Sequence, residues 1–276
     1  MWLHLIARRG LSRVVGWITS ARLPAFLIQG AIRWFVRKYG VDLSQVAEPI
    51  PSFKTFNAFF TRTLLPQARP ICADPDAVVS PADGLFTSHG PLVAGELWQI
   101  KGRTYSAAEF LGSEEDARRY ADGVFATVYL SPRDYHRVHT PVSGAITGLR
   151  YIPGLLYPVN HLSIDRIDRL FAVNERIITF VDTEAFGRVA IVMVGATNVG
   201  SMQMSFQEYR TNVGKTRIED IPVAAGAKLR RGDEVGRFHL GSTVVLLLER
   251  GDLAMIHGEN TPVQMGEALM RRPGSD

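Results

Sequence analysis

Hydrophobic residues in the first part of the chain recur at the spacing of an α-helix. At about 100° per residue, one side of the first segment carries Leu3, Ile6, Gly10, Val14, Trp17 and Ile18. The opposite side carries His4, Arg8, Arg9 and Ser12. A second segment starts at Pro24, a residue type favoured in the first turn of a helix. Its apolar side carries Ile28, Ile32, Phe35, Val36 and Tyr39, opposite Gln29, Arg33 and Arg37. The pattern predicts two amphipathic helices.

The pattern changes after a proline-containing linker at residues 47–52. The next segment, 53–64, has Phe53, Phe56, Phe60 and Leu64 on one stripe and predicts a short helix. Beyond it, β-branched or aromatic runs bounded by turn residues predict strands at 124–130, 176–181, 189–194 and 244–248, with one helix at 112–120. The expected fold class is α+β, with amino-terminal amphipathic helices at 1–46 and a mainly antiparallel β body at 47–276.

Charge is distributed as unevenly as hydropathy along the 276 residues. The chain has 31 Lys and Arg against 27 Asp and Glu, which gives a net charge of +4. Residues 1–41 hold seven of the basic residues and none of the acidic ones, so the remainder is slightly acidic. The positive charge therefore belongs to the helical arm, and the body lacks the basic character that favours nucleic acid.

Membrane contact is one interpretation of this arm. Its longest uncharged stretches, 14–21 and 23–32, are shorter than the roughly 20 residues needed to span a bilayer. Arg22 interrupts the apolar runs and no small-residue cleavage site follows, which argues against a secretory signal. Cationic amphipathic helices with aromatic residues are typical of helices that lie in a membrane interface. The alternative is that both helices pack on the body or on another subunit.

Cysteine usage limits the chemistry further. Cys72 is the single cysteine, so the chain can form no internal disulfide and no cysteine-based metal site. Nothing in this usage points to an oxidising compartment, and an intracellular setting is expected.

The densest group of reactive side chains lies in residues 129–144. Ser131, Pro132 and Asp134 have the order of a helix start, with a cap, a first-turn proline and an acid three residues after the cap. In a helical turn that followed, His136 and His139 would share a face, whereas on a strand they would point apart. Such a pair suits metal binding or proton transfer. Two half-exposed loop histidines are the alternative.

Two further segments carry a carboxylate and a hydroxyl. Asp83 precedes Gly84 in a turn after a strand, where an aspartate can serve only to stabilise the turn. The sequence 241–243, Gly-Ser-Thr, precedes a uniformly apolar strand, where a glycine can mark a simple bulge. Together with His139, Asp83 and Ser242 supply a base, an orienting carboxylate and a nucleophile. The sequence lacks the Gly-x-Ser-x-Gly motif of α/β-hydrolases.

A set of segments in fixed order resembles one enzyme family, the bacterial, membrane-associated, pyruvoyl-dependent phosphatidylserine decarboxylases. The segments are the basic amphipathic start, Thr55–Arg62, Pro81–Gly84, Tyr129–His139, Val159–Leu162, Asn174–Arg176, Val194–Thr197 and Gly236–Thr243. The resemblance covers nearly the whole chain, and residues 202–227 depart most from the family pattern.

The resemblance implies that the chain cuts itself between Gly241 and Ser242. The products would be a β chain of residues 1–241 and an α chain of residues 242–276. His139, oriented by Asp83, would take the proton of the Ser242 hydroxyl, and the oxygen would attack the Gly241 carbonyl. Elimination of the resulting ester would leave dehydroalanine, whose hydrolysis would give ammonia and a pyruvoyl group derived from Ser242. This covalent pyruvate is the implied cofactor, and no metal is expected.

In the reaction that the resemblance implies, the pyruvoyl group forms a Schiff base with the amine of phosphatidylserine and accepts the electrons released with CO₂. Protonation and hydrolysis give phosphatidylethanolamine, with His136 assisting decarboxylation or delivering the proton. The implied partners are phosphatidylserine in an anionic membrane and the enzyme's own α and β chains. The implied location is peripheral, on the cytoplasmic face of the cell membrane. The oligomeric state stays open, and Asn160, His161 and Arg176 fit headgroup, core and turn roles equally well.

Two rival functions remain open. The turns at 80–84 and 141–146 also resemble those of biotinyl- and phosphocarrier-like β-sandwiches, in which a histidine pair accepts a phosphoryl group. The second rival is a serine hydrolase that uses Asp83, His139 and Ser242 on external esters. A carrier would remain one polypeptide, and a hydrolase would keep a reactive Ser242 hydroxyl, whereas the decarboxylase would do neither.

Overall fold

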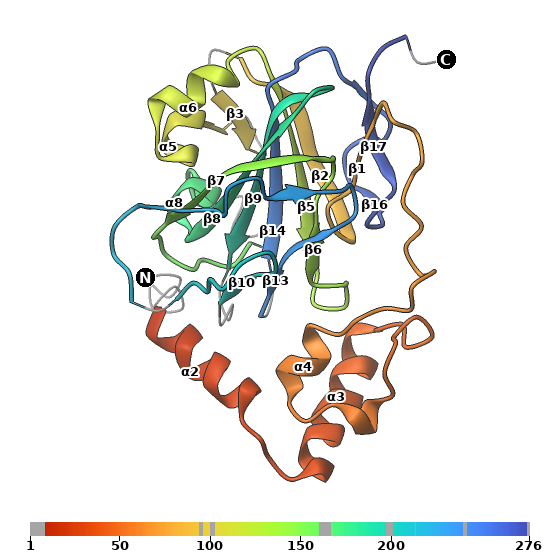
Figure 1. Ribbon diagram of the computed structural model, residues 1–276. Helices are drawn as coiled ribbons and strands as arrows, with labels where there is room; N and C mark the ends of the chain where they lie inside the picture. The colour runs from red at the N-terminus through yellow and green to blue at the C-terminus, as the bar shows by residue number, and fades with distance from the viewer. Residues whose placement is uncertain are drawn as a thin grey trace.

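The computed structural model describes residues 9–93, 96–99, 103–159, 167–196, 201–212, 214–239 and 242–274. A helical unit lies at one end of a larger β body (Figure 1). The helical unit contains α2 (Arg9–Ser20), α3 (Ala25–Tyr39), a 3₁₀ turn η1 (Ile50–Ser52) and α4 (Phe56–Phe60). No helix in the described part of the chain is long and apolar enough to span a bilayer.

Local sequence explains where these helices begin and end. Helix α3 ends at Gly40, whose φ of 68° lies in the left-handed region that glycine adopts without steric cost. Helix α4 is capped by the Thr55 hydroxyl, which accepts a hydrogen bond from the Ala58 N–H at 3.0 Å. The helix predicted over 53–64 is therefore only five residues long. The chain after it pairs with the linker, because Val46 and Leu64 form an antiparallel bridge.

The apolar side of α3 is buried inside the helical unit. Its buried residues, Ile28, Ile32 and Phe35, pack against aromatic residues at 53–60. The Phe35 ring lies 6.0 Å from the Phe60 ring and 5.1 Å from the Phe56 ring. The membrane interpretation is wrong for this side of α3, the second predicted helix, because α4 covers it. The alternative, that the helix packs on the rest of the protein, applies to this side. The helical unit accordingly extends past residue 46, the expected boundary, through Leu64.

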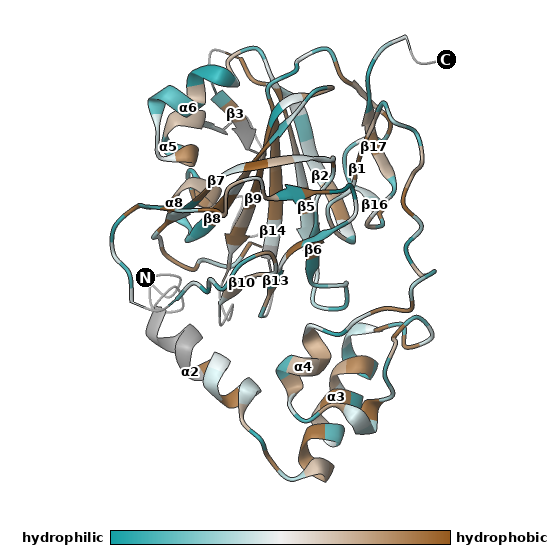
Figure 2. Ribbon diagram, in the orientation of Figure 1, coloured by the Kyte–Doolittle hydropathy of each residue, from teal (hydrophilic) through white to brown (hydrophobic). Residues whose placement is uncertain are grey.

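A different apolar surface of the helical unit is open to solvent. Its exposed large residues are Trp17, Ile18, Leu23, Phe26, Leu27 and Trp34, which are 48–75% exposed. Helix α3 therefore has apolar residues on two sides, one buried against α4 and one exposed (Figure 2). Residues 1–8, which carry part of the first predicted amphipathic pattern, lie outside the described residues.

The body is built from short antiparallel strands. The strands are β1 (Ala77–Val79), β2 (Gly84–Pro91), β3 (Glu96–Gln99), β4 (Arg103–Ser106), β5 (Val124–Leu130), β6 (Arg137–His139), β7 (Gly144–Ile152), β8 (Arg176–Thr183), β9 (Gly187–Gly195), β10 (Met202–Met204), β11 (Glu219–Ile221), β12 (Lys228–Leu229), β13 (Glu234–Phe238), β14 (Ser242–Leu248), β15 (Ala254–Met255), β16 (Thr261–Val263) and β17 (Ala268–Arg271). The helices of the body are α5 (Ala107–Leu111), α6 (Glu114–Arg119) and α8 (Leu170–Val173). The α+β class is confirmed.

Within the described residues, nine strands form the main sheet, in the order β11-β7-β8-β9-β14-β5-β2-β16 with β12 also paired to β7. Two smaller sheets, β1-β17-β15 and β10-β13-β6, lie beside it. The strands predicted at 124–130, 176–181, 189–194 and 244–248 correspond to β5, β8, β9 and β14. The helix predicted at 112–120 corresponds to α6, and a second helix, α5, precedes it and ends at Gly112 with a φ of 67°.

Strand β14 lies in the interior of the main sheet. It pairs with β9 on one side and β5 on the other along its full length. Residues Val244–Leu248 are fully buried. A continuous apolar run is what a strand covered on both faces requires, and it is the pattern that predicted this strand.

We expect Leu246→Ala to lower the free energy of unfolding by about 2–5 kcal/mol, because it removes a buried side chain from this strand. Urea denaturation would measure the loss, in a Ser242→Ala background that is expected to keep the protein as one chain. The matched control is Leu65→Ala, at a side chain that is 44% exposed, with an expected change within about 0.5 kcal/mol. Equal losses in both variants would contradict this account of β14.

Candidate active site

Sheet register brings the candidate residues to one end of the main sheet. Ser242, the first residue of β14, pairs with Leu130 of β5 and with Gly195 of β9. Strand β2 begins at Gly84, and Leu85 pairs with Tyr129 of β5. The residues that precede β2, that follow β5 and that begin β14 therefore lie close together. Gly241 is outside the described residues, and only the backbone of Ser242 is described.

Gly84 permits the close approach of β2 to β5. A Cβ atom at this position would lie 2.3 Å from the carbonyl oxygen of Tyr129, well inside van der Waals contact. The backbone approach therefore requires glycine, which explains why Asp83 is followed by this residue. The result is that Asp83 is held beside the end of β5.

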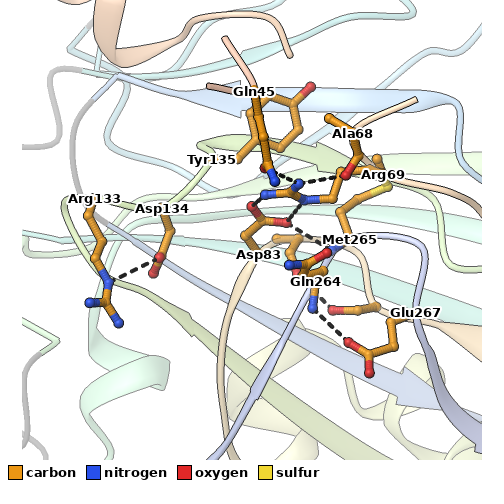
Figure 3. Close-up of polar contacts among 12 residues, drawn as sticks. Gln45, Ala68, Arg69, Asp83, Arg133, Asp134, Tyr135, Gln264, Met265 and Glu267 are labelled. Carbon is orange, nitrogen blue, oxygen red and sulfur yellow. Dashed lines mark hydrogen bonds and ion pairs between the residues drawn. The ribbon is translucent and has the colours of Figure 1, made fainter. Parts of the chain in front are cut away.

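Asp83 is buried and bound by an arginine (Figure 3). Its Oδ1 accepts hydrogen bonds from Arg69 Nε at 2.7 Å and from the Met265 N–H at 2.9 Å, and its Oδ2 forms an ion pair with the other side of the same guanidinium. Arg69 Nη1 also donates to Gln45 Oε1 at 2.6 Å. The carboxylate is thus held by Arg69, from the segment before β1, and by Met265, from the loop after β16. Gln45 in turn holds Arg69.

His139, the last residue of β6, is held in one tautomer. Its backbone N–H donates to the Pro81 carbonyl at 2.8 Å, which joins its strand to the Asp83 loop. Its Nδ1 lies 2.8 Å from the Gly232 carbonyl, so Nδ1 carries the proton and Nε2 is the basic nitrogen. The Tyr135 hydroxyl donates to Nε2 at 3.1 Å. The direct hydrogen bond expected between Asp83 and His139 is therefore replaced by one from His139 to Gly232.

The residues before His139 form a turn and not a helix. The Asp134 N–H donates to the Ser131 carbonyl at 3.0 Å, and the Asp134 carboxylate accepts a hydrogen bond from the Ser131 N–H at 2.7 Å. The chain then extends into β6, because its hydrogen bonds go to β13. His136 and His139 consequently contact different groups, and the prediction that they share a helical face is wrong.

His136 is completely buried under α4. Its ring lies 4.0 Å from the Phe60 ring, and its Nδ1 donates to the Asp134 carbonyl at 2.8 Å. Burial, with a smaller contribution from the charge of Arg62, lowers the pKa of His136 to about 3. His136 is therefore a neutral imidazole whose Nε2 can only accept a hydrogen bond.

Several buried polar atoms near the start of β14 lack a partner among the described residues. They include Ser131 Oγ, His136 Nε2 and Thr243 Oγ1. Ser131 directly follows Leu130, the partner of Ser242, and Thr243 directly follows Ser242. Unsatisfied buried groups are rare in folded proteins, and their concentration here is typical of a site that binds a polar group. Of these residues, Ser131 lines a cavity of about 320 Å³ together with Asp83 and Tyr129.

Other residues considered from the sequence have different positions. The Arg176 guanidinium is buried and donates to the carbonyls of Glu109, Phe110, Ala172 and Asn174, so its role is structural. Asn160 and His161 lie outside the described residues. Sequence reasoning missed the contacts of Arg69, Tyr135 and Gly232. Tyr135 was inside a segment that carried the resemblance, but Arg69 and Gly232 had no local pattern to identify them.

Comparison with known proteins gives a consistent result over nearly the whole chain. The family model described as phosphatidylserine decarboxylase matches residues 56–271, and a model described as PSD matches residues 4–40. A phosphatidylserine decarboxylase proenzyme of Brevibacillus brevis is 42% identical over 270 residues, which cover 97% of this chain and 95% of that protein. The proenzymes of Vibrio parahaemolyticus and Pseudomonas aeruginosa are 43% and 41% identical, covering 97% and 96% of this chain and 97% and 94% of those proteins.

We expect proton transfer to His139 to fall to half of its maximal rate at a pH below 6.5. Burial lowers the pKa of His139 below its ordinary value of 6.5, so the base remains neutral until more acid is added. The rate at which the full-length precursor disappears, followed by intact mass, measures this profile. In Tyr135→Phe, which loses the hydrogen bond to neutral Nε2, the decline should begin at higher pH. A wild-type midpoint at or above pH 6.5 would contradict the assignment of the base.

Proposed function

Because this chain belongs to the phosphatidylserine decarboxylase family, we propose that it converts phosphatidylserine into phosphatidylethanolamine and CO₂ in phospholipid biosynthesis. We further propose that it first cuts itself between Gly241 and Ser242. The observation that carries this proposal is the position of Ser242 at the first residue of β14, between the ends of β5 and β9. The loop that holds Asp83 leads into β2, which pairs with β5, and the His139 backbone N–H donates to the Pro81 carbonyl in that loop.

The cut uses His139 as the general base. Nε2 of His139 takes the proton of the Ser242 hydroxyl, and the oxygen attacks the Gly241 carbonyl carbon. A C–O bond forms as the C–N bond between Gly241 and Ser242 breaks, and the His139 imidazolium gives its proton to the nitrogen, which leaves as an amine. The Tyr135 hydroxyl, which donates to Nε2, must move aside or relay the proton. The Gly232 carbonyl keeps His139 in the tautomer that this transfer requires.

Asp83 supports this base electrostatically in the proposed mechanism. The carboxylate makes no direct bond to His139 but favours its protonated form, together with Glu234. Arg69 and the Met265 N–H fix the orientation of the carboxylate. Asp83 is therefore placed to stabilise the imidazolium that forms during the cut.

A pyruvoyl group made from Ser242 fits the unsatisfied polar atoms of the site. Ser131 Oγ and Thr243 Oγ1 are the buried hydroxyls placed to hold it. When present, the group supplies a ketone that condenses with the substrate amine and accepts the electrons released as CO₂ leaves. The two chains, residues 1–241 and 242–276, stay together because β14 keeps both of its neighbours in the sheet.

His136 assists decarboxylation in this scheme. Its Nε2 is a buried, unpartnered acceptor, so it can take a proton from the substrate and return one to the former α-carbon. A positioned general acid or base of this kind contributes about 10²–10⁴-fold to the rate. Phe60 and the Asp134 carbonyl hold the ring in place.

The helical unit is proposed to dock on the cytoplasmic face of the membrane as a peripheral element. Its support is the exposed apolar surface of α2 and α3 together with the seven basic residues of 1–41. The Lys38 ammonium lies 4.6 Å from the Trp34 ring, so cationic and aromatic groups adjoin on this surface. Substrate in an anionic lipid layer would be drawn to such a surface.

For the reaction itself, purified wild-type protein is expected to release CO₂ from phosphatidylserine and to appear as two chains by intact mass. We expect Ser242→Ala and His139→Ala to remain uncut, because one lacks the nucleophile and the other the base. In contrast, His136→Ala should still cut but release CO₂ about 10²–10⁴-fold more slowly. Thr19→Ala, in α2, is a control that should behave as wild type.

Two outcomes would overturn these assignments. An uncut wild-type protein with full activity would exclude the pyruvoyl mechanism, because the active enzyme would then be a single chain. Equal loss of cutting in all three variants shows that the division of roles between the two histidines is wrong. Labelling of mature Ser242 by a fluorophosphonate would favour the serine hydrolase.

We expect Trp17→Ser, Phe26→Ser and Trp34→Ser together to weaken binding to anionic vesicles by about tenfold or more, because the aromatic side chains no longer enter the interface. Sedimentation with phosphatidylglycerol-containing vesicles measures the binding. The control replaces Val93, Ile218 and Ile256, which are 45–56% exposed on the body, by serine. Comparable losses in both triple variants would move the lipid contact away from the helical unit.

A further inference from the structure

Arg62 is a buried cation with unused hydrogen-bonding capacity. It follows α4, and its residue is only 4% exposed. Its Nη2 donates to the Arg133 and Asp134 carbonyls at 2.8 and 3.2 Å. Its Nε and Nη1 have no partner among the described residues, and no described carboxylate forms an ion pair with it. A buried guanidinium in this condition is costly unless an anion approaches it.

Arg176 shows what a structural buried arginine looks like in the same protein. It is 2% exposed, yet its Nε, Nη1 and Nη2 all donate to backbone carbonyls. Both residues are buried. They differ because every side-chain nitrogen of Arg176 has a hydrogen-bond partner, whereas Nε and Nη1 of Arg62 have none among the described residues. Arg62 retains three N–H groups for a ligand.

Arg62 lines a cavity between the helical unit and the segments that carry Asp83 and Tyr135. This cavity has a volume of about 230 Å³ and is also lined by Asp42 and Gln45 on one side and by Asp83, Arg133 and Tyr135 on the other. Figure 3 shows Gln45, Arg69, Asp83 and Tyr135 gathered at this point. The Arg133 side chain is 64% exposed and supplies a second cation at the edge of the cavity.

The acidic groups around this cavity are already occupied. Asp83 is paired with Arg69, and Asp42 accepts hydrogen bonds from the backbone and hydroxyl of Ser44. Asp134 accepts a hydrogen bond from the Ser131 N–H and forms an ion pair with Arg133, in which Nε lies 3.8 Å from Oδ1. Among the described residues, Arg62 is therefore the cation of this cavity that forms no ion pair.

We propose that Arg62 binds the phosphodiester of the lipid headgroup, with Arg133 as a second contact. This inference rests on the proposed function and adds the headgroup site to it. In the lipid, the phosphodiester lies between the diacylglycerol and the serine. In the protein, the cavity lies between the helical unit and the segments that carry Asp83 and Tyr135. Arginine presents a planar fork that matches phosphate oxygens.

The substrate carboxylate is the less suitable anion for this position. It must lose its negative charge as CO₂ leaves, so a cation bound to it would stabilise the ground state more than the transition state. The phosphodiester keeps its charge throughout the reaction. An arginine can therefore bind it without opposing the chemistry.

The test measures binding of glycerophosphoglycerol, a phosphodiester without amine or carboxylate, by calorimetry. We expect Arg62→Gln to weaken this binding by about 10- to 100-fold, the loss typical of a charge-assisted hydrogen bond. The Michaelis constant for soluble dihexanoyl phosphatidylserine should rise by a similar factor, with little change in kcat and with normal self-cleavage by intact mass. The matched control is Arg230→Gln, at a side chain that is 92% exposed, which should leave both constants unchanged.

Further measurements distinguish a bound phosphodiester from a bound carboxylate, and a wrong proposal from a variant that fails to fold. Serine, which has a carboxylate and no phosphodiester, should inhibit wild type and Arg62→Gln equally; a selective loss of serine inhibition assigns the carboxylate to Arg62 and overturns the proposal. Arg62→Lys keeps the charge but loses the fork, so it should give an intermediate loss even where Arg62→Gln fails to fold. Unchanged phosphodiester binding in Arg62→Lys and Arg62→Gln also overturns it. Absence of CO₂ release by wild type counts against the proposed function alone, because calorimetry still tests the site.

Discussion

The pairing of β14 on both sides is the constraint on which the rest of the structure depends. Its backbone bonds to β5 and β9 begin at Ser242, the residue at which the proposed cut occurs. A bond broken at the end of such a strand leaves the pairing of residues 243–248 in place and exposes none of the buried residues at 244–248. The new chain end would therefore be held at a fixed place between β5 and β9. Autocatalytic cutting and a rigid site are compatible because of this arrangement.

A buried ion pair connects the site to the helical unit. Arg69 binds Asp83 and is itself bound by Gln45, in the segment between α3 and α4. The same segment is tied to the chain after α4, because the Leu65 N–H donates to the Gln45 carbonyl at 2.8 Å. Removing one partner of a buried pair typically costs about 3–5 kcal/mol, since the other charge is left uncompensated. The orientation of the Asp83 carboxylate thus depends on the correct docking of the unit that carries the exposed apolar surface.

The fold was more predictable from the sequence than the contacts of the site. The strand at 124–130 was found because a continuous apolar run needs only local information, whereas Ser131-Pro132 matched a helix start and became a turn when β6 paired with β13. The buried face of α3 was recognised as apolar, but nothing local shows that α4 covers it. Asp83 and His139 were identified as candidates, while Arg69 and Gly232 were not, because their contacts span 14 and 93 positions. Such partners follow from tertiary packing and leave no local pattern.

The electrostatics of His136 define the order of proton transfers in the proposed reaction. With a pKa of about 3, the ring carries no proton on Nε2 before substrate binds. A phosphodiester bound to Arg62 would offset the smaller, coulombic cause of this low pKa, but burial, the larger cause, would remain. His136 must therefore begin each turnover as an acceptor. The substrate ammonium has to lose a proton before its nitrogen can act as a nucleophile, and Nε2 is the unpartnered acceptor available to take it.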